Sequence, residues 1–469
     1  MPQSQSIAEY SKLYDQYSNE NDYRKVPLIE SEWITIKDQS EMENYLPKPN
    51  IATITIGISK IQTETISNFE SIDVSKSIPN KRAHILNVGG SVWGLDFVPK
   101  PSSCKSSDQY LTIGGYNSTT EHHLLTEDVD RNDRFNVIQI WKCRSCITKF
   151  KPMLDMCILH DFGVVVDFKW CPYSVYDVEK LGILAAMFNN GEIRLLVVPH
   201  PQHVKRARIV LQLSNKNDNA FCFAWGGYRN LACGTRSGSI VIWDIVESLL
   251  QDTVLVHVNI PNASLSPIRC IAWKSLFDEM TLFTSDMDGN ILLHDLNDPF
   301  FPSKIFRVRH TYICLCGPGF GSGFLYGESD GIMRKNMCLT ARKSIALTSH
   351  NSMIWQCAVS PHHGIMASVG SNGTAMVKPF AHNDIEYTQS HRPAEYTLYE
   401  LVYDQNSKTF KYIDGIKPKT TFPEREYYNV LSNPIIALQK IAWNTNKNAC
   451  GWVVSGGAAG LCRLEYTGL

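Results

Sequence analysis

Short apolar runs of five to seven residues, rich in β-branched and aromatic side chains, are separated by polar turns along most of the chain. Clear examples are Val164–Trp170, Ala220–Trp225, Ile240–Asp244 and Ile268–Trp273. Runs of this length and composition, bounded by Gly, Asn, Asp and Ser, are typical of β-strands. The pattern therefore predicts an all-β protein built from many short strands.

A turn glycine precedes several of these runs at a nearly constant interval. In the clearest copy, Ser237–Asp244, the turn leads into a strand that ends in Trp-Asp, and Asn136 takes the glycine place in an earlier copy. The turn glycines are Gly191, Gly238, Gly289, Gly331, Gly373 and Gly460. A period of about 40–45 residues with this signature is typical of WD-repeat β-propellers, in which each repeat forms one four-stranded blade. Seven copies predict a seven-bladed propeller over residues 81–469.

The last interval between turn glycines holds one ordinary period and about 45 further residues. Residues 381–431 contain no copy of the turn phrase, so we expect an insertion between blades six and seven instead of an eighth blade. Within it, Tyr396–Tyr403 and Thr409–Ile413 could pair as a hairpin. The last blade needs one more strand, and the segment just before Val92 can supply it. This closure would remove exposed sheet edges.

Residues 1–80 differ in composition from the rest of the chain. They are polar and contain 7 Lys and Arg against 12 Asp and Glu. We expect an N-terminal extension that is mostly disordered or folds only against a partner. The β-branched segment Ile51–Ile58 is the exception, because it alternates as a strand and could add an edge to the propeller.

Overall charge and cysteine content narrow the class of protein. The net charge of -1 gives no general basic field for nucleic acid. The 14 cysteines fall mostly in expected strands, and the N-terminal residues have no apolar run typical of a signal peptide. No stretch has the ~18 consecutive apolar residues of a membrane span. We therefore expect reduced thiols in the cytosol or nucleus, and no membrane association.

Candidate catalytic and metal-binding residues have simpler structural interpretations. A zinc site needs four ligands, and no second pair completes Cys143-x-x-Cys146 convincingly, since Cys314-x-Cys316 is spaced too tightly. His350 is expected to be a structural histidine of its repeat. The remaining histidine pairs are expected in polar turns and loops: His122 with His123, His200 with His203, and His362 with His363. No cofactor, metal or catalytic residue is predicted, and no enzyme.

Two further segments could contact phosphate. Gly317–Gly323 is rich in glycine, but no helix follows to present its amide groups, so a strand and turn are expected there. Lys205, Arg206 and Arg208 form the densest basic cluster, which is either a nuclear import signal or phosphate contact, or an ordinary solvated strand. The residues that bind partners or DNA are therefore unknown from the sequence.

Three segments resemble a particular family. They are Leu86–Phe97 with its Gly-Gly-Ser-Val-Trp-Gly-Leu-Asp-Phe phrase, Val165–Pro172, and Gly182–Pro199. Together they are similar to the WD-repeat subunit of transcription factor IIIC, a general factor of RNA polymerase III, over about residues 85–200. That family has a similar opening phrase, a long first-blade loop and a similar end of the second blade.

The resemblance implies a nuclear, non-enzymatic scaffold within a multi-subunit complex. The partners implied are a second propeller subunit and the large DNA-binding subunit, which engages the internal B-box promoter of transfer RNA genes. Promoter DNA would be bound mainly through the complex, because residues 1–80 are net acidic where some family members carry a long basic extension. The alternative is a cytosolic WD-repeat scaffold, such as a ubiquitin-ligase substrate adaptor or a trafficking adaptor.

Overall fold

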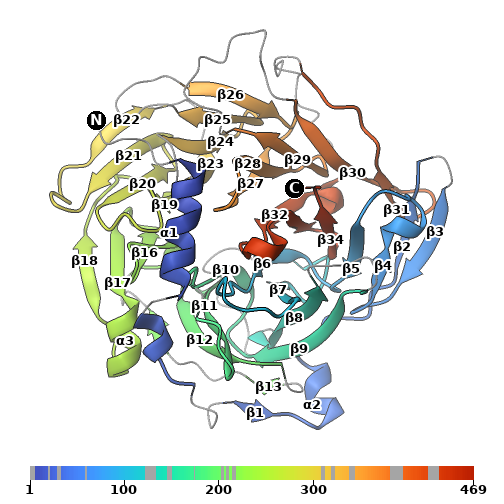
Figure 1. The fold of residues 1–469 in the computed structure, drawn as a ribbon, viewed down its shortest axis with the longest axis horizontal. Coiled ribbons are helices and arrows are strands. Elements are labelled where there is room, and N and C mark those ends of the chain that lie inside the picture. Colours follow the sequence, from blue (N-terminus) through green and yellow to red (C-terminus); the bar gives the residue numbers. More distant parts are fainter. Residues whose placement is uncertain are drawn as a thin grey trace.

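The structure is a computed structural model of the 469-residue chain. It describes residues 6–19, 22–28, 33–58, 61–121, 134–144, 150–173, 175–201, 205–206, 211–213, 218–307, 312–317, 323–336, 344–380, 394–420 and 433–468. The strands lie in radial sheets around a central axis, which is the arrangement of a β-propeller (Figure 1). The predicted all-β propeller class is therefore confirmed.

Six sheets are blades of four strands that follow one another closely along the chain. The first three contain, from the axis outward, β6 (Val92–Phe97), β7 (Asp108–Gly115), β8 (Asn136–Arg144) and β9 (Met153–His160); β10 (Val165–Trp170), β11 (Lys180–Phe188), β12 (Ile193–Pro199) and β14 (Leu211–Leu213); and β15 (Ala220–Gly226), β16 (Asn230–Thr235), β17 (Ile240–Asp244) and β18 (Val256–Ile260).

The next three blades have the same order. They contain β19 (Ile268–Trp273), β20 (Thr281–Asp286), β21 (Asn290–Asp295) and β22 (Ser303–Arg307); β23 (Tyr312–Cys316), β24 (Phe324–Glu328), β25 (Ile332–Asn336) and β26 (Ser344–Ser349); and β27 (Ile354–Val359), β28 (Ile365–Gly370), β29 (Thr374–Pro379) and β30 (Tyr396–Asp404).

A seventh sheet joins the two ends of the described chain. Three strands late in the sequence, β32 (Leu438–Trp443), β33 (Trp452–Gly457) and β34 (Leu461–Tyr466), pair with β5 (Ala83–Asn87) and β4 (Ser71–Asp73). β34 and β5 are antiparallel, with Leu461 opposite Asn87 and Glu465 opposite Ala83. The expected closure by the segment before Val92 is confirmed.

The insertion expected at 381–431 extends the sixth blade. Its hairpin is formed by β30 and β31 (Thr409–Ile413), as predicted, and β30 is the fourth strand of the blade. β31 pairs in parallel with β2 (Ala52–Ile56), which pairs with β3 (Gln62–Ile66). The strand expected within Ile51–Ile58 is therefore present and adds to a sheet edge. Residues 381–393 and 421–432 lie outside the described part.

The described part of residues 1–80 lies over the propeller and has little core of its own. It contains α1 (Ile7–Asn19), the 3₁₀ turns η1 (Asp22–Lys25) and η3 (Val74–Lys76), β1 (Ile34–Thr35) and α2 (Gln39–Glu43). Tyr10, Tyr14 and Tyr23 are almost fully buried against the blades. The expected disorder of this segment stays a prediction, because the structure shows the surface that it covers and not how often it leaves that surface.

Tryptophan side chains connect neighbouring sheets at the ends of the innermost strands. The indole N–H of Trp225 donates to the carbonyl of Lys169 at 3.0 Å, and that of Trp273 donates to the carbonyl of Ala224 at 3.1 Å. Trp443 of the seventh sheet donates to the carbonyl of Ala358 in the sixth blade at 3.2 Å. These hydrogen bonds use the only polar atom of a buried aromatic ring, so packing and register are fixed together.

The repeated turn glycines have the conformation that the repeat requires. Five glycines from Gly191 to Gly373, and Gly460, have φ between 70° and 89°. At Gly238 an added Cβ would lie 2.2 Å from the carbonyl oxygen of Ser264, so a larger residue would clash there. Asn136 is different: it begins β8, and its side chain donates to the carbonyl of Gly115 at 2.9 Å. Asn136 keeps the register of the repeat, since Trp141 pairs with Leu111 as Trp243 pairs with Leu231, but it does so without the positive φ of the turn glycines.

Buried histidines hold strands together within blades. His350 lies 2.8 Å from the Thr374 hydroxyl through Nδ1 and 2.7 Å from the Ser368 hydroxyl through Nε2. The predicted structural role of His350 is confirmed. Asp244, which ends the clearest copy of the repeat, has another role. Its carboxylate accepts a hydrogen bond from the backbone N–H of Glu247 and caps the helix α3 (Ile245–Gln251).

Trp243→Ala should lower the free energy of unfolding by about 3–5 kcal/mol, because the side chain is 2% exposed within the core between the second and third blades. Urea denaturation measures the change. Val178→Ala is the matched control, since Val178 is 94% exposed, and it should leave the midpoint unchanged. An unchanged midpoint for Trp243→Ala would contradict the packing described here.

Stability should fall as the pH is lowered from about 6.5 toward 4. Burial lowers the pKa of His350 to about 3, so the folded protein keeps this ring neutral while the unfolded chain takes up a proton near pH 6.5. Burial also lowers the pKa of His160 and of His294. In His350→Gln the slope of unfolding free energy against pH should be shallower by about 1 kcal/mol per pH unit over this range. An unchanged slope in His350→Gln would show that His350 is not kept neutral.

Candidate functional site

The seven innermost strands surround a central channel with a cavity of about 620 Å³. Each of these strands has a bulge at the same place in its pairing with the second strand of its sheet. Six of the bulge residues line the cavity: Trp93, Val166, Phe221, Arg269, Trp355 and Gln439. The shifts fall between Val92 and Gly94, Val165 and Asp167, Ala220 and Cys222, Ile268 and Cys270, Tyr312 and Cys314, Ile354 and Gln356, and Leu438 and Lys440. The third and fifth residues of the strands therefore line the channel wall at matching heights.

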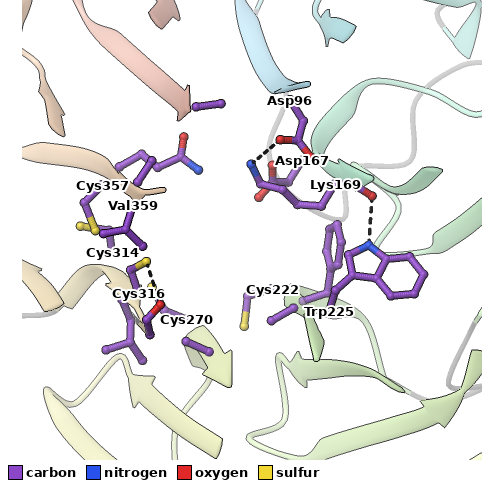
Figure 2. Close-up of a pocket in the computed structure, with 18 of the residues that line it drawn as sticks. Asp96, Asp167, Lys169, Cys222, Trp225, Cys270, Cys314, Cys316, Cys357 and Val359 are labelled. Atoms are coloured by element: carbon purple, nitrogen blue, oxygen red, sulfur yellow. Dashed lines mark hydrogen bonds and ion pairs between the residues drawn. The ribbon is translucent and has the colours of Figure 1, made fainter. Parts of the chain in front are cut away.

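One side of the channel is charged (Figure 2). Asp96 of β6 lies beside Asp167 and Lys169 of β10, and Lys440 of β32 completes the group. The Lys440 ammonium lies 2.9 Å from the Asp167 carboxylate, and the Lys169 ammonium lies 3.7 Å from that of Asp96. Burial lowers the pKa of Lys440 and raises that of Asp96. Both ion pairs thus compensate charges that the channel removes from water.

The opposite side of the channel carries thiols and alanines. Cys222, Cys270, Cys314, Cys316 and Cys357 come from four consecutive innermost strands (Figure 2). Burial raises the pKa of Cys222 and Cys270, which keeps these thiols protonated and makes the wall apolar. Hydrogen bonding to Cys314 and Cys316 raises the pKa of Cys357. In the described part of the chain, no group of three or more His, Cys, Asp or Glu side chains could hold a metal ion.

The helix α1 lies over one side of the ring (Figure 1) and contributes to one end of the channel. Tyr10 and Tyr14 line the cavity there, and Tyr10 packs against Phe277 with a ring-centroid distance of 5.4 Å. The Asp15 carboxylate lies 2.6 Å from the ammonium of Lys447, which follows the end of β32. Phe277 and Lys447 follow the last residues of innermost strands, whereas the bulges are at the first residues, so α1 and the bulges belong to opposite ends of the channel.

Of the candidates singled out in the sequence, Cys314, Cys316 and Gly317 line this channel, and the other described candidates have structural roles elsewhere. His362 Nδ1 forms a hydrogen bond with the Ser11 hydroxyl at 2.9 Å, and His363 Nε2 forms one with the carbonyl of Cys450 at 3.0 Å. Both histidines therefore connect segments that are distant in the sequence. His200 contacts the carbonyl of Asp177 at 2.7 Å. Cys143 is buried in β8, where burial raises its pKa to about 12. Residues outside the described part are His122, His123, Cys146, His203, Arg208 and Gly319–Gly321.

The basic cluster falls on a short strand. Lys205 and Arg206 form β13, which pairs with β1 and in parallel with β9 at the outer edge of the first blade. A strand is therefore present at Lys205 and Arg206, and a role of this cluster in nuclear import or phosphate contact stays a prediction.

The structure and the relatives define the chain first as a WD-repeat-type β-propeller similar to general transcription factors. The chain is 22% identical over 482 residues to transcription factor tau subunit sfc6 of Schizosaccharomyces pombe. The aligned region covers 98% of this chain and 78% of that protein. It is 20% identical to general transcription factor 3C polypeptide 2 of Homo sapiens and of Pongo abelii, over 81% of this chain and 52% of each. The chain thus spans about half the length of these two relatives. No protein family model matches the chain.

These relatives are subunits of transcription factor IIIC. The resemblance inferred from residues 85–200 is therefore confirmed, and it extends over nearly the whole chain. In the described part, no helix is long and apolar enough to cross a membrane.

Asp167→Asn should lower the free energy of unfolding by about 2 kcal/mol, because it leaves the Lys440 ammonium buried without its partner. Lys440→Met in the same chain should restore most of the loss, and urea denaturation of the two single variants and the double variant measures the coupling. Asp22→Asn is the control, since its pair with Lys25 is on the surface and should give no measurable change. Additive losses in the double variant would show that the channel pair is not coupled.

Proposed function

We propose that the chain is a non-enzymatic architectural subunit of a transcription factor IIIC complex in the nucleus. In this role it supports recognition of internal B-box promoters and recruitment of the RNA polymerase III machinery. The observation that carries the proposal is the similarity to a transcription factor IIIC subunit over 98% of the chain. The proposed partners are the second propeller subunit and the large DNA-binding subunit of the complex.

The propeller acts by presenting loops and edges on a rigid frame. Large apolar side chains project into solvent from several of its loops, where their exposure to water is unfavourable. Phe300 and Phe301 are adjacent and 62% and 78% exposed, and Leu265 is 98% exposed. Large exposed apolar side chains are common where a protein contacts another subunit. This distribution supports docking of partner subunits on the outer loops.

The same proposal includes the expected division of the chain into an extension, residues 1–80, and a seven-bladed propeller, residues 81–469. Support for counting the seventh sheet as a blade comes from its innermost strand, β32, which has the same bulge as the other six innermost strands. The hydrogen bond from Trp443 to the sixth blade matches those between the earlier blades. The seventh sheet also packs against the first blade through Val92, Val454 and Leu464.

The charge of the chain favours DNA binding by the complex over binding by this subunit alone. The net charge is -1 and residues 1–80 are acidic, so few phosphates could be neutralised. We therefore expect the isolated chain to bind B-box DNA weakly at near-physiological salt, and the assembled complex to bind it tightly. Fluorescence anisotropy with a B-box duplex, with and without partner subunits, measures the difference, and a scrambled duplex of the same length is the control.

Tight B-box-specific binding by the isolated chain would overturn the scaffold role. Lys205, Arg206 and Arg208 would then be the first residues to replace. Purification of the tagged protein from its own cells separates the proposal from a cytosolic adaptor. Copurification with RNA polymerase III factors supports the proposal, and a cytosolic location without these factors contradicts it.

A further inference from the structure

The open end of the central channel carries a different set of side chains from the wall. The bulge residues of the innermost strands surround this end, opposite α1. Trp93, Phe221 and Trp355 provide aromatic surface, and Arg269 and Gln439 provide polar groups. Trp93 and Trp355 meet edge to face with a centroid distance of 5.7 Å and an interplanar angle of 82°. An aromatic rim around a pocket is a shape that accepts a few residues of an extended chain.

Arg269 supplies the uncompensated charge of this pocket. The described charged residues that line it are Asp96, Asp167, Lys169, Arg269 and Lys440, which leaves one excess positive charge. Lys440 pairs with Asp167, and Lys169 with Asp96. Arg269 has no ion pair or hydrogen bond with the residues that the structure describes. Burial lowers the pKa of Lys440, and the positive charges of Lys169 and Arg269, which line the same channel, lower it further.

Two further polar atoms at this end are buried without a partner among the described residues. They are the indole Nε1 of Trp355 and the side-chain oxygen Oε1 of Gln439. Their strands, β27 and β32, are neighbours around the channel. An unpaired buried donor or acceptor costs about 1–3 kcal/mol, and such groups usually find a partner. The indole N–H needs an acceptor, and the amide oxygen needs a donor.

We propose that the open end of the central channel binds an extended acidic segment of a partner protein. An aspartate or glutamate side chain of that segment pairs with Arg269, and a neighbouring apolar side chain packs against Trp93 and Trp355. Trp355 Nε1 and Gln439 Oε1 are covered by protein atoms, so their pairing with the backbone of the segment requires these two side chains to turn toward it. A peptide carries all of these groups within a few residues: a carboxylate, an apolar side chain, and both a donor and an acceptor.

The same geometry disfavours nucleic acid as the occupant. Nucleic-acid binding depends on several cations spaced along a phosphate backbone. Among the described residues that line it, the channel offers one uncompensated cation. The test uses the isolated chain and short peptides, so its outcome does not depend on membership of a transcription factor IIIC complex.

The test is selection of random dodecapeptides displayed on phage against the immobilised full-length chain. We expect enriched peptides to contain Asp or Glu beside an aromatic or aliphatic residue. A fluorescein-labelled copy of the most enriched peptide is then titrated by anisotropy. Arg269→Gln should weaken its binding at least tenfold, Arg269→Lys should retain part of the affinity, and higher salt should weaken binding to the unaltered chain.

Two controls keep the result interpretable. Lys304→Gln removes one positive charge from the exposed outer strand β22 and should leave binding unchanged. The urea midpoint of Arg269→Gln should match that of the unaltered chain, because Arg269 makes no contact that the fold needs. The proposal is overturned if no acidic peptide is enriched, if only basic or neutral peptides are enriched, or if Arg269→Gln and Lys304→Gln bind the selected peptide equally.

Discussion

The hydrogen bond from an indole N–H to the innermost strand of the preceding sheet is the contact on which the propeller depends most directly. Trp225, Trp273 and Trp443 each reach the carbonyl of the fifth residue in the neighbouring strand. Trp170 makes a related contact to the hydroxyl of Thr112 at 2.9 Å. Each contact fixes the height of one innermost strand against the next. The channel wall inherits this alignment, because its side chains come from the positions beside these carbonyls.

Strand order and closure could be predicted from the sequence because each repeat carries its own local signal. Turn glycines such as Gly238 require positive φ, and the apolar strands beside them have the right length. The early elements could not be predicted in the same way. α1 has only a few apolar residues, and Tyr10 and Tyr14 become buried because the propeller supplies the surface that covers them. Such burial depends on contacts between distant parts of the chain, which periodicity does not reveal.

The candidate site was missed because its residues look like structural ones in the sequence. Arg269 is the second residue of its strand, as Phe221 and Trp355 are of theirs. The bulge at this position brings all three residues to the channel lining. An alignment of the innermost strands at their third and fifth residues would have shown charged side chains in some strands where other strands have Cys or Ala. The histidine pairs attracted notice for their chemistry, yet His362 and His363 bond to loops. The position of a side chain in the fold, and not its residue type, therefore distinguishes the channel residues from these structural histidines.

The pairing of β5 with β34 has a consequence for how the protein is made. These strands are separated by nearly all of the described chain, so β5 leaves the ribosome long before its partner is synthesised. Until then, its neighbours in sequence can form blades while β5 has an unpaired edge on the side that β34 later occupies. Contacts so distant in sequence form late and slowly, and unpaired strand edges promote aggregation. Closing the ring therefore has to wait until the last strands have been synthesised, and β5 keeps an unpaired edge until then.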